Sequence, residues 1–180
     1  DRRGGMTVQR LLALLTPRLL WALVALACFG SVVMALVAQH RFGMEPCPWC
    51  VLQRVIFLAI GLVGALGALL PGLRIAQLAL GLCGVGLALA GVAAALFQNL
   101  VAAKSASCAL TLADRIISNL GLDRWQPEVF EVRASCADAA VSILGVPFEI
   151  WSLLLYLALG AAALWLALGR PGSGPAARRR

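Results

Sequence analysis

Four cysteines have the spacing and surroundings for thiol chemistry. Cys47 and Cys50 form a Cys-Pro-Trp-Cys motif, and Cys108 and Cys136 follow in a later segment, 28 residues apart. We expect Cys50 at or just before the first turn of a helix, where unpaired N–H groups and the helix dipole favour an anion. Arg54 follows one helical turn later on the same face. Both features favour the thiolate, the reactive form of cysteine, so the motif predicts a redox-active pair.

Other roles compete for these residues. A structural disulfide between Cys47 and Cys50 would close so short a loop that it would remove little entropy from the unfolded chain. Zinc would need two more ligands, and Cys108 and Cys136 lack the short spacing of zinc ligands, so we expect no metal. For this second pair, a disulfide that braces the loop and a redox pair both remain open. Arg54 could instead extend its charge to the membrane surface.

The composition predicts an integral membrane protein. Of the 180 residues, 62% are hydrophobic and 13% are charged, whereas soluble domains have roughly 45–50% and 25%. So little polar surface could not enclose so much apolar material. The composition therefore argues against a soluble globule, a disordered chain and a nucleic-acid-binding protein, although the net charge is +7.

Four apolar stretches are long enough to cross a bilayer, which takes about 20 residues. Pro71-Gly72 predicts a tight turn between the second and third. The length of the first run favours a retained span over a cleaved signal peptide. We expect an all-α integral membrane protein with a single domain, residues 1–180, built as a four-helix transmembrane bundle. The predicted spans cover residues 19–38, 51–70, 75–97 and 148–168.

Basic residues predict how the bundle is oriented. Nine lie in the tails, 1–18 and 169–180, and in the turn after the second span, against five in the segments 39–50 and 98–147. The positive-inside rule makes both tails cytoplasmic and both segments periplasmic. All four cysteines considered above fall in these outer segments, where disulfides persist. Cys28 and Cys83 lie mid-span and are expected to be buried small apolar residues.

The long periplasmic loop is expected to carry short amphipathic helices. Ser107 and Ser135 each precede a cysteine and are typical N-caps. The apolar spacing predicts one helix that begins at Cys108 and a second over residues 137–144. Both are expected to lie on the membrane surface, beside the aromatic residues Trp125 and Phe130.

Three stretches together resemble a known family. The motif Cys47-Pro48-Trp49-Cys50-Val51-Leu52-Gln53-Arg54 opens the second span, Arg124-Trp125-Gln126-Pro127-Glu128-Val129-Phe130 leads to Cys136, and Gly145 precedes Trp151-Ser152-Leu153 at the last span. With four spans and a long outer loop, the chain is similar to the bacterial disulfide bond formation protein B (DsbB) family. The resemblance covers residues 19–168.

This resemblance implies a thiol:quinone oxidoreductase of the bacterial inner membrane. Such a protein reoxidises a periplasmic thioredoxin-fold, DsbA-like partner and passes two electrons to a membrane quinone, ubiquinone or menaquinone. By position, Cys108 would form the mixed disulfide with the partner and Cys136 would exchange with Cys47. Cys50 would then engage the quinone, with Arg54 beside it.

Two alternatives and two departures accompany the resemblance. The chain could be a quinone reductase of the vitamin K epoxide reductase type, or a non-catalytic four-span protein with structural outer disulfides. The motif's place at the second span favours the DsbB resemblance. Residues 93–99 lack a histidine that some family members carry, and His40 is expected to be interfacial. Glu149 stands where a proline is common, two residues before Trp151.

Overall fold

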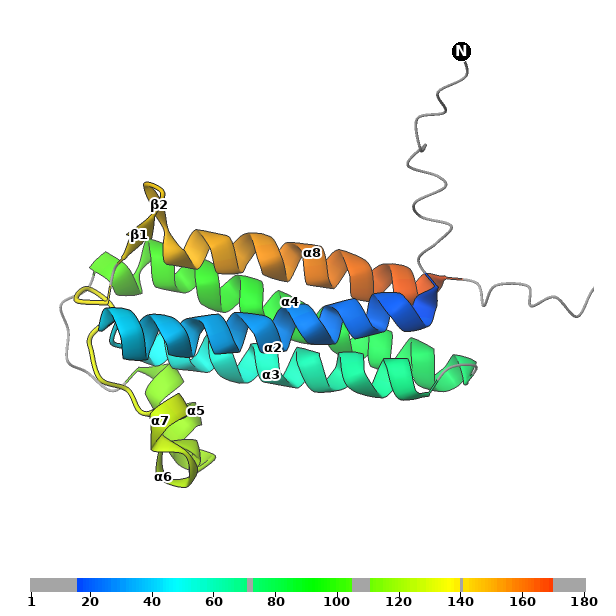
Figure 1. Ribbon diagram of the computed structural model, residues 1–180, viewed down its shortest axis with the longest axis horizontal. Helices are drawn as coiled ribbons and strands as arrows, with labels where there is room; N and C mark the ends of the chain where they lie inside the picture. The colour runs from blue at the N-terminus through cyan, green and yellow to red at the C-terminus, as the bar shows by residue number, and fades with distance from the viewer. Residues whose placement is uncertain (1–15, 71–72, 105–110, 140, 170–180) are drawn as a thin grey trace, which may run out of the picture.

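Four long helices lie side by side in this computed structural model, which describes residues 16–70, 73–104, 111–139 and 141–169 (Figure 1). Each helix is long and apolar enough to cross a membrane. The predicted four-helix transmembrane bundle is therefore confirmed. The helices are α2 (Pro17–Phe42), α3 (Pro48–Leu69), α4 (Arg74–Leu100) and α8 (Phe148–Leu168).

Local capping sets where the first two helices begin. Thr16 caps α2 by accepting a hydrogen bond from the Leu19 N–H, and α2 ends at Gly43, whose φ of 64° is left-handed. Cys47 is the N-cap of α3, and Pro48 follows in the first turn, where its missing N–H costs nothing. Helix α3 begins at Pro48, three residues before the predicted span, so Cys50 lies within its first turn.

The bundle is packed unevenly. Helix α2 packs on α3, α3 on α4 and α4 on α8, whereas α2 and α8 have little contact. Small residues let α4 and α8 approach closely: a Cβ added at Gly91 would lie 2.4 Å from the ring of Tyr156. The weak contact between α2 and α8 leaves space between these two helices.

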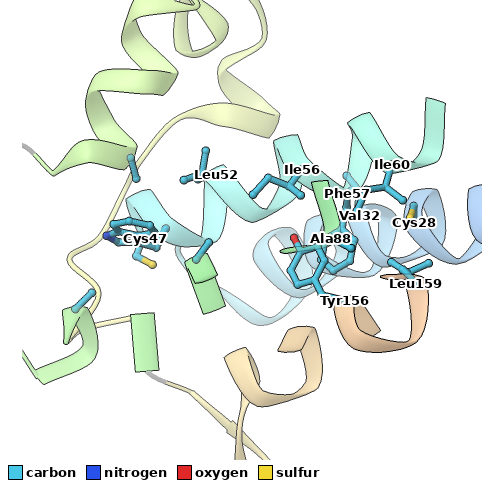
Figure 2. Packing of buried hydrophobic residues seen from close by; sticks show 14 of the residues in the cluster. Cys28, Val32, Cys47, Leu52, Ile56, Phe57, Ile60, Ala88, Tyr156 and Leu159 are labelled. Atoms are coloured by element: carbon cyan, nitrogen blue, oxygen red, sulfur yellow. The ribbon is translucent and has the colours of Figure 1, made fainter. Parts of the chain in front are cut away.

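Aromatic packing joins α3 to α8 in the core. The rings of Phe57 and Tyr156 stack with centroids 4.2 Å apart (Figure 2). Cys28 is fully buried beside them, as predicted. Cys83, in contrast, is exposed on α4, so its predicted burial is wrong. Glycine and alanine, not Cys83, occupy the packed face of this helix, at Gly81, Gly84, Ala88 and Gly91.

The loop between α4 and α8 packs at one end of the bundle, which we call the loop end (Figure 1). Phe130 and Ile117 from this loop pack against Val51 of α3. The segments are a 3₁₀ turn η1 (Ala102–Lys104), the helices α5 (Leu112–Asn119), α6 (Leu122–Trp125) and α7 (Pro127–Phe130), and the strands β1 (Ser142–Ile143) and β2 (Val146–Pro147).

The first loop helix begins later than predicted. Helix α5 starts at Leu112, because Thr111 and Asp114 form a reciprocal capping box that satisfies the free N–H groups of its first turn. The predicted cap Ser107, like Cys108, lies outside the described residues.

The second predicted loop helix, residues 137–144, is wrong. Ser135 caps only a single turn, through Asp138, and the chain then forms the antiparallel pair β1–β2. Leu144 and Gly145 both have positive φ, 55° and 78°. Two such residues make a tight hairpin turn, which ends helical structure at this point.

Candidate active site

Three cysteine sulfurs meet at the start of α3. The Sγ atoms of Cys47 and Cys50 are 2.7 Å apart, and the Cys136 side chain forms a hydrogen bond with Cys47. The backbone N–H of Trp49 also donates to the Cys136 sulfur. All three cysteines are free thiols in this structure. The structure thus brings together three of the four predicted redox cysteines, and the fourth, Cys108, lies outside the described residues.

Backbone hydrogen bonds bring Cys136 to this position. The carbonyl of Pro46 accepts from the N–H groups of Arg133, at 3.1 Å, and Ala134, at 3.3 Å. These bonds tie the segment before Cys136 to the residue before Cys47. The N–H of Cys50 donates to the Cys47 sulfur over 3.3 Å. The two halves of the site are therefore held together by main-chain contacts.

Hydrogen bonds separate the pKa values of Cys47 and Cys136. The bonds to Cys136 and then to Cys50 raise the pKa of Cys47 far above that of an ordinary thiol, and burial adds to this effect. The bond from Cys47 lowers the pKa of Cys136 despite partial burial, helped by the Trp49 N–H. Cys47 therefore stays a thiol that donates, while Cys136 is the better thiolate.

Buried amides surround Cys50. The Gln98 Nε2 donates to the Cys50 sulfur at 3.3 Å, and the Gln53 Nε2 donates to the Gln98 Oε1 at 2.7 Å. The hydroxyl of Tyr156 donates to the Gln53 carbonyl at 2.9 Å. Sequence reasoning did not select Gln53 or Gln98 as site residues. The available signal was an amide side chain within or next to an apolar run, which costs free energy unless it is hydrogen-bonded.

Arg54 is buried and held by two acceptors. Its side chain is 6% exposed, and Nη1 donates to the Gln39 Oε1 at 2.8 Å and to the Val129 carbonyl at 2.9 Å. Gln39 also donates to the Glu128 carbonyl, at 3.4 Å. Arg54 therefore joins α2, α3 and α7 at the loop end instead of extending its charge to the surface.

A cavity of about 500 Å³ opens between α2 and α8, within the range typical of small-molecule sites. Its walls are mostly apolar, with a few polar side chains at the loop end. A quinone head group is a flat ring with two carbonyl oxygens, and these walls offer both an apolar surface and hydrogen-bond donors. The residues present therefore fit such a group. The polar lining residues include Cys50, Gln53, Arg54, Gln98 and Glu149.

Three other residues named from the sequence, His40, Trp125 and Phe130, do not line this cavity. His40 is partly exposed and lies 3.7 Å from the Glu128 carboxylate, as expected of an interfacial residue. Trp125 is exposed, whereas Phe130 is buried against α3. Phe130 therefore docks the loop onto the bundle.

The family model for disulfide bond formation protein DsbB matches residues 17–166. The chain belongs to the DsbB family. Disulfide bond formation protein B of Ralstonia nicotianae is 36% identical over 155 residues, covering 85% of this chain and 94% of that protein. The protein of the same name from Cupriavidus metallidurans is 33% identical over 154 residues, covering 84% and 91%. Disulfide bond formation protein B 2 of Pseudomonas aeruginosa is 33% identical over 169 residues, covering 88% and 97%.

Membership of the DsbB family confirms the predicted activity. The chain is an oxidoreductase of disulfide bond formation, and DsbB proteins reoxidise DsbA with a quinone in the inner membrane. The vitamin K epoxide reductase alternative and the non-catalytic alternative are set aside by this assignment. The resemblance drawn from the motif at the second span was correct.

Proposed function

We propose that electrons pass from a periplasmic thioredoxin-fold, DsbA-like protein through two cysteine pairs of this chain to a quinone in the cavity between α2 and α8. One observation carries the proposal: Cys136, Cys47 and Cys50 lie in one cluster, and Cys50 also lines the cavity. Cysteines that extend from the outer loop to an apolar cavity can carry electrons from a protein thiol to a lipid-soluble acceptor.

The loop pair reacts first. A thiolate of the reduced partner attacks Cys108 of a Cys108–Cys136 disulfide, and Cys136 leaves as a thiolate. The partner's second thiolate then attacks the mixed disulfide, which releases oxidised partner and leaves Cys108 reduced. Hydrogen bonds from Cys47 and Trp49 suit Cys136 for the role of leaving group, because they stabilise its thiolate.

The second exchange transfers the two electrons to the membrane pair. The Cys136 thiolate attacks Cys47 of a Cys47–Cys50 disulfide, and Cys108 then attacks Cys136 to restore the loop disulfide. Cys50 is released as a thiolate on the cavity wall, where it accepts a hydrogen bond from the Gln98 amide. The reduced pair now holds the electrons that the partner brought.

The cavity residues then act on the acceptor. A bound quinone, ubiquinone or menaquinone, supplies a two-electron acceptor that is soluble in the bilayer. The Arg54 guanidinium stabilises negative charge in this part of the cavity, since a buried cation acts strongly where water is excluded. The apolar walls contributed by α2 and α8 keep water away from the Cys50 sulfur.

The proposed orientation places the loop end in the periplasm and the tails, 1–18 and 169–180, in the cytoplasm. Helix α2 begins, α3 ends and α8 ends at the side of the bundle opposite the loop end (Figure 1). Arg18 and Arg74 lie at this opposite side, which supports the orientation through the positive-inside rule.

A reconstituted assay tests the electron route. Purified protein is mixed with reduced thioredoxin-fold partner and a short-chain ubiquinone, and quinone reduction is followed by its absorbance. We expect turnover by the wild type, and none by Cys50→Ser or Cys108→Ser. Cys83→Ser is the matched control and should be fully active, because Cys83 lies on the outer face of α4. Wild-type turnover by Cys50→Ser or Cys108→Ser would refute the route.

A further inference from the structure

Glu149 is a buried carboxyl group that the electron route leaves without a role. It lies in the first turn of α8 and is only 5% exposed. The Asn99 Nδ2 of α4 donates to its Oε1 at 3.0 Å. Glu149 also lines the cavity that Cys50 lines. Burying a carboxyl group costs free energy, and in a membrane helix such a residue is functional by default.

The surroundings of Glu149 do not pair its charge. Within the described residues, its hydrogen-bond partner is Asn99, and no cation lies within ion-pair distance. The other titratable groups that line the cavity are Cys50 and Arg54 of α3 and the exposed Glu45 at the rim. A salt bridge therefore does not explain why this carboxyl group is buried.

Proton balance gives the carboxyl group a task. Oxidation of the Cys47 thiol and the Cys50 thiolate to a disulfide releases two electrons and one proton, and reduction of a quinone to a quinol consumes two electrons and two protons. The apolar walls keep water from the interior of the cavity, so a proton released there needs a carrier to reach the quinone. Arg54 does not exchange protons in the physiological range, and the amides of Gln53 and Gln98 are not titratable. Glu149 is the buried carboxyl group among the lining residues.

Resting on the proposed function, we propose that Glu149 is the proton carrier of the quinone cavity. Glu149 takes up the proton that the Cys47 thiol releases and donates it to a quinone oxygen as the electron pair leaves the Cys50 sulfur. The second proton reaches the other oxygen from solvent at the rim, because Cys50 enters this step as a thiolate and brings none. Asn99 acts as a positioning residue, because its bond to Oε1 holds the carboxyl group at the wall.

Single-turnover kinetics test the proposal. Protein reduced at Cys47 and Cys50 is mixed rapidly with a short-chain ubiquinone, and quinone reduction is followed by absorbance. Glu149→Gln keeps an acceptor for Asn99 but cannot give up a proton, so we expect quinone reduction to slow by about 100-fold. Glu131→Gln, an exposed acid away from the cavity, is the control and should react at the wild-type rate.

Two further measurements separate proton transfer from a structural role. The quinone dissociation constant of Glu149→Gln, measured by quenching of tryptophan fluorescence, should stay within about twofold of the wild-type value. Formate should restore the rate of Glu149→Ala in proportion to its concentration and leave the wild type unchanged. Weaker quinone binding by Glu149→Gln without formate rescue, or a wild-type rate for Glu149→Gln, would overturn the proposal.

The partner reaction distinguishes this proposal from the electron route. Reduction of the loop pair by the partner should proceed at the wild-type rate in Glu149→Gln, because Glu149 does not touch the sulfur exchange. If the wild type itself reduced no quinone, the electron route would fail. If the wild type reduced quinone and Glu149→Gln did so equally fast, only the proton carrier would fail.

Discussion

Hydrogen-bond donors stabilise negative charge on the sulfurs of the candidate active site. The Cys50 sulfur accepts a hydrogen bond from the Gln98 amide, and the Cys136 sulfur accepts hydrogen bonds from Cys47 and from the Trp49 N–H. Arg54 was expected to act on Cys50 from one turn away. Its charge does interact with Cys50, and its Nη1 bonds to Gln39 and Val129 hold this positive charge in place at the cavity wall.

Replacement of Arg54 should weaken quinone binding more than sulfur exchange. Loss of the interaction between the Arg54 charge and a quinone oxygen should cost about 1.5–3 kcal/mol of binding free energy, as for other hydrogen bonds to charged groups. We therefore expect Arg54→Met to raise the quinone KM about tenfold or more, and Arg54→Lys to restore part of it. Reduction of the loop pair by the partner should be unchanged. Arg41→Met, an exposed cation at the end of α2, is the control. An unchanged KM would show that Arg54 has only a structural role.

The two pKa directions predict how alkylation depends on pH. Because its pKa is lowered, Cys136 in the fully reduced protein should reach half of its maximal alkylation rate at a lower pH than free glutathione. Cys47, whose pKa is raised, should react only at higher pH. Mass spectrometry of iodoacetamide-treated protein measures both rates. In Cys47→Ala the donor is lost, so the Cys136 profile should shift to higher pH. Identical profiles in both proteins would contradict the assignment.

At the scale of the elements, the packing of α4 against α8 depends on the small residues along one face of α4. Gly91 lies against the Tyr156 ring, and the Tyr156 hydroxyl supports the Gln53 carbonyl beside the active site. Gly86 lies on the same helix with nothing within 4 Å of an added Cβ. These two glycines therefore provide a matched pair in which only the contact with α8 differs.

Alanine at these two positions should have opposite effects. Overpacking at Gly91→Ala should lower the free energy of unfolding by about 1–3 kcal/mol, because the Tyr156 ring must move. Gly86→Ala should leave stability unchanged or raise it by up to about 1 kcal/mol, since alanine favours helix. Thermal unfolding in detergent, followed by circular dichroism, measures both changes. Equal stabilities would mean that α4 and α8 can separate at no cost.

Sequence patterns predicted some elements better than others. The four spans follow from apolar runs that a bilayer alone makes helical, because no water is present to satisfy the backbone. The segment after Cys136 has no such constraint. A helix was predicted over residues 137–144, whereas the positive φ of Leu144 and Gly145 forms a hairpin turn. A short apolar segment does not distinguish a helix from a strand by periodicity alone.

At the scale of the whole molecule, the site depends on contacts between distant segments. Cys47, Cys50 and Arg54 could be identified from one motif, because their relation is local. Gln39, Gln98 and Glu149 could not, since they come from other helices. Only packing brings Gln98 and Glu149 to the cavity wall and Gln39 to Arg54. Their side chains reach the site because α2, α4 and α8 meet α3 at the loop end.

The proposed orientation of the bundle predicts which positions are accessible from outside the cell membrane. In a variant without native cysteines, a cysteine at Arg124 of α6 should react with a membrane-impermeant maleimide added to spheroplasts. A cysteine at Leu73, between α3 and α4, should react only after the membrane is permeabilised. Both residues are exposed in the structure, so burial would not explain a difference. The reverse pattern would invert the topology.

The cavity is bordered by side chains that are themselves exposed on the outer surface of α2 and α8, among them Leu26, Met34 and Trp151. A carrier with a long isoprenoid chain can thus leave that chain among the acyl tails while its ring enters sideways. Exchange of spent for fresh carrier then proceeds by two-dimensional diffusion. The turnover rate should scale with the number of carrier molecules per lipid, whatever the volume of the surrounding solution.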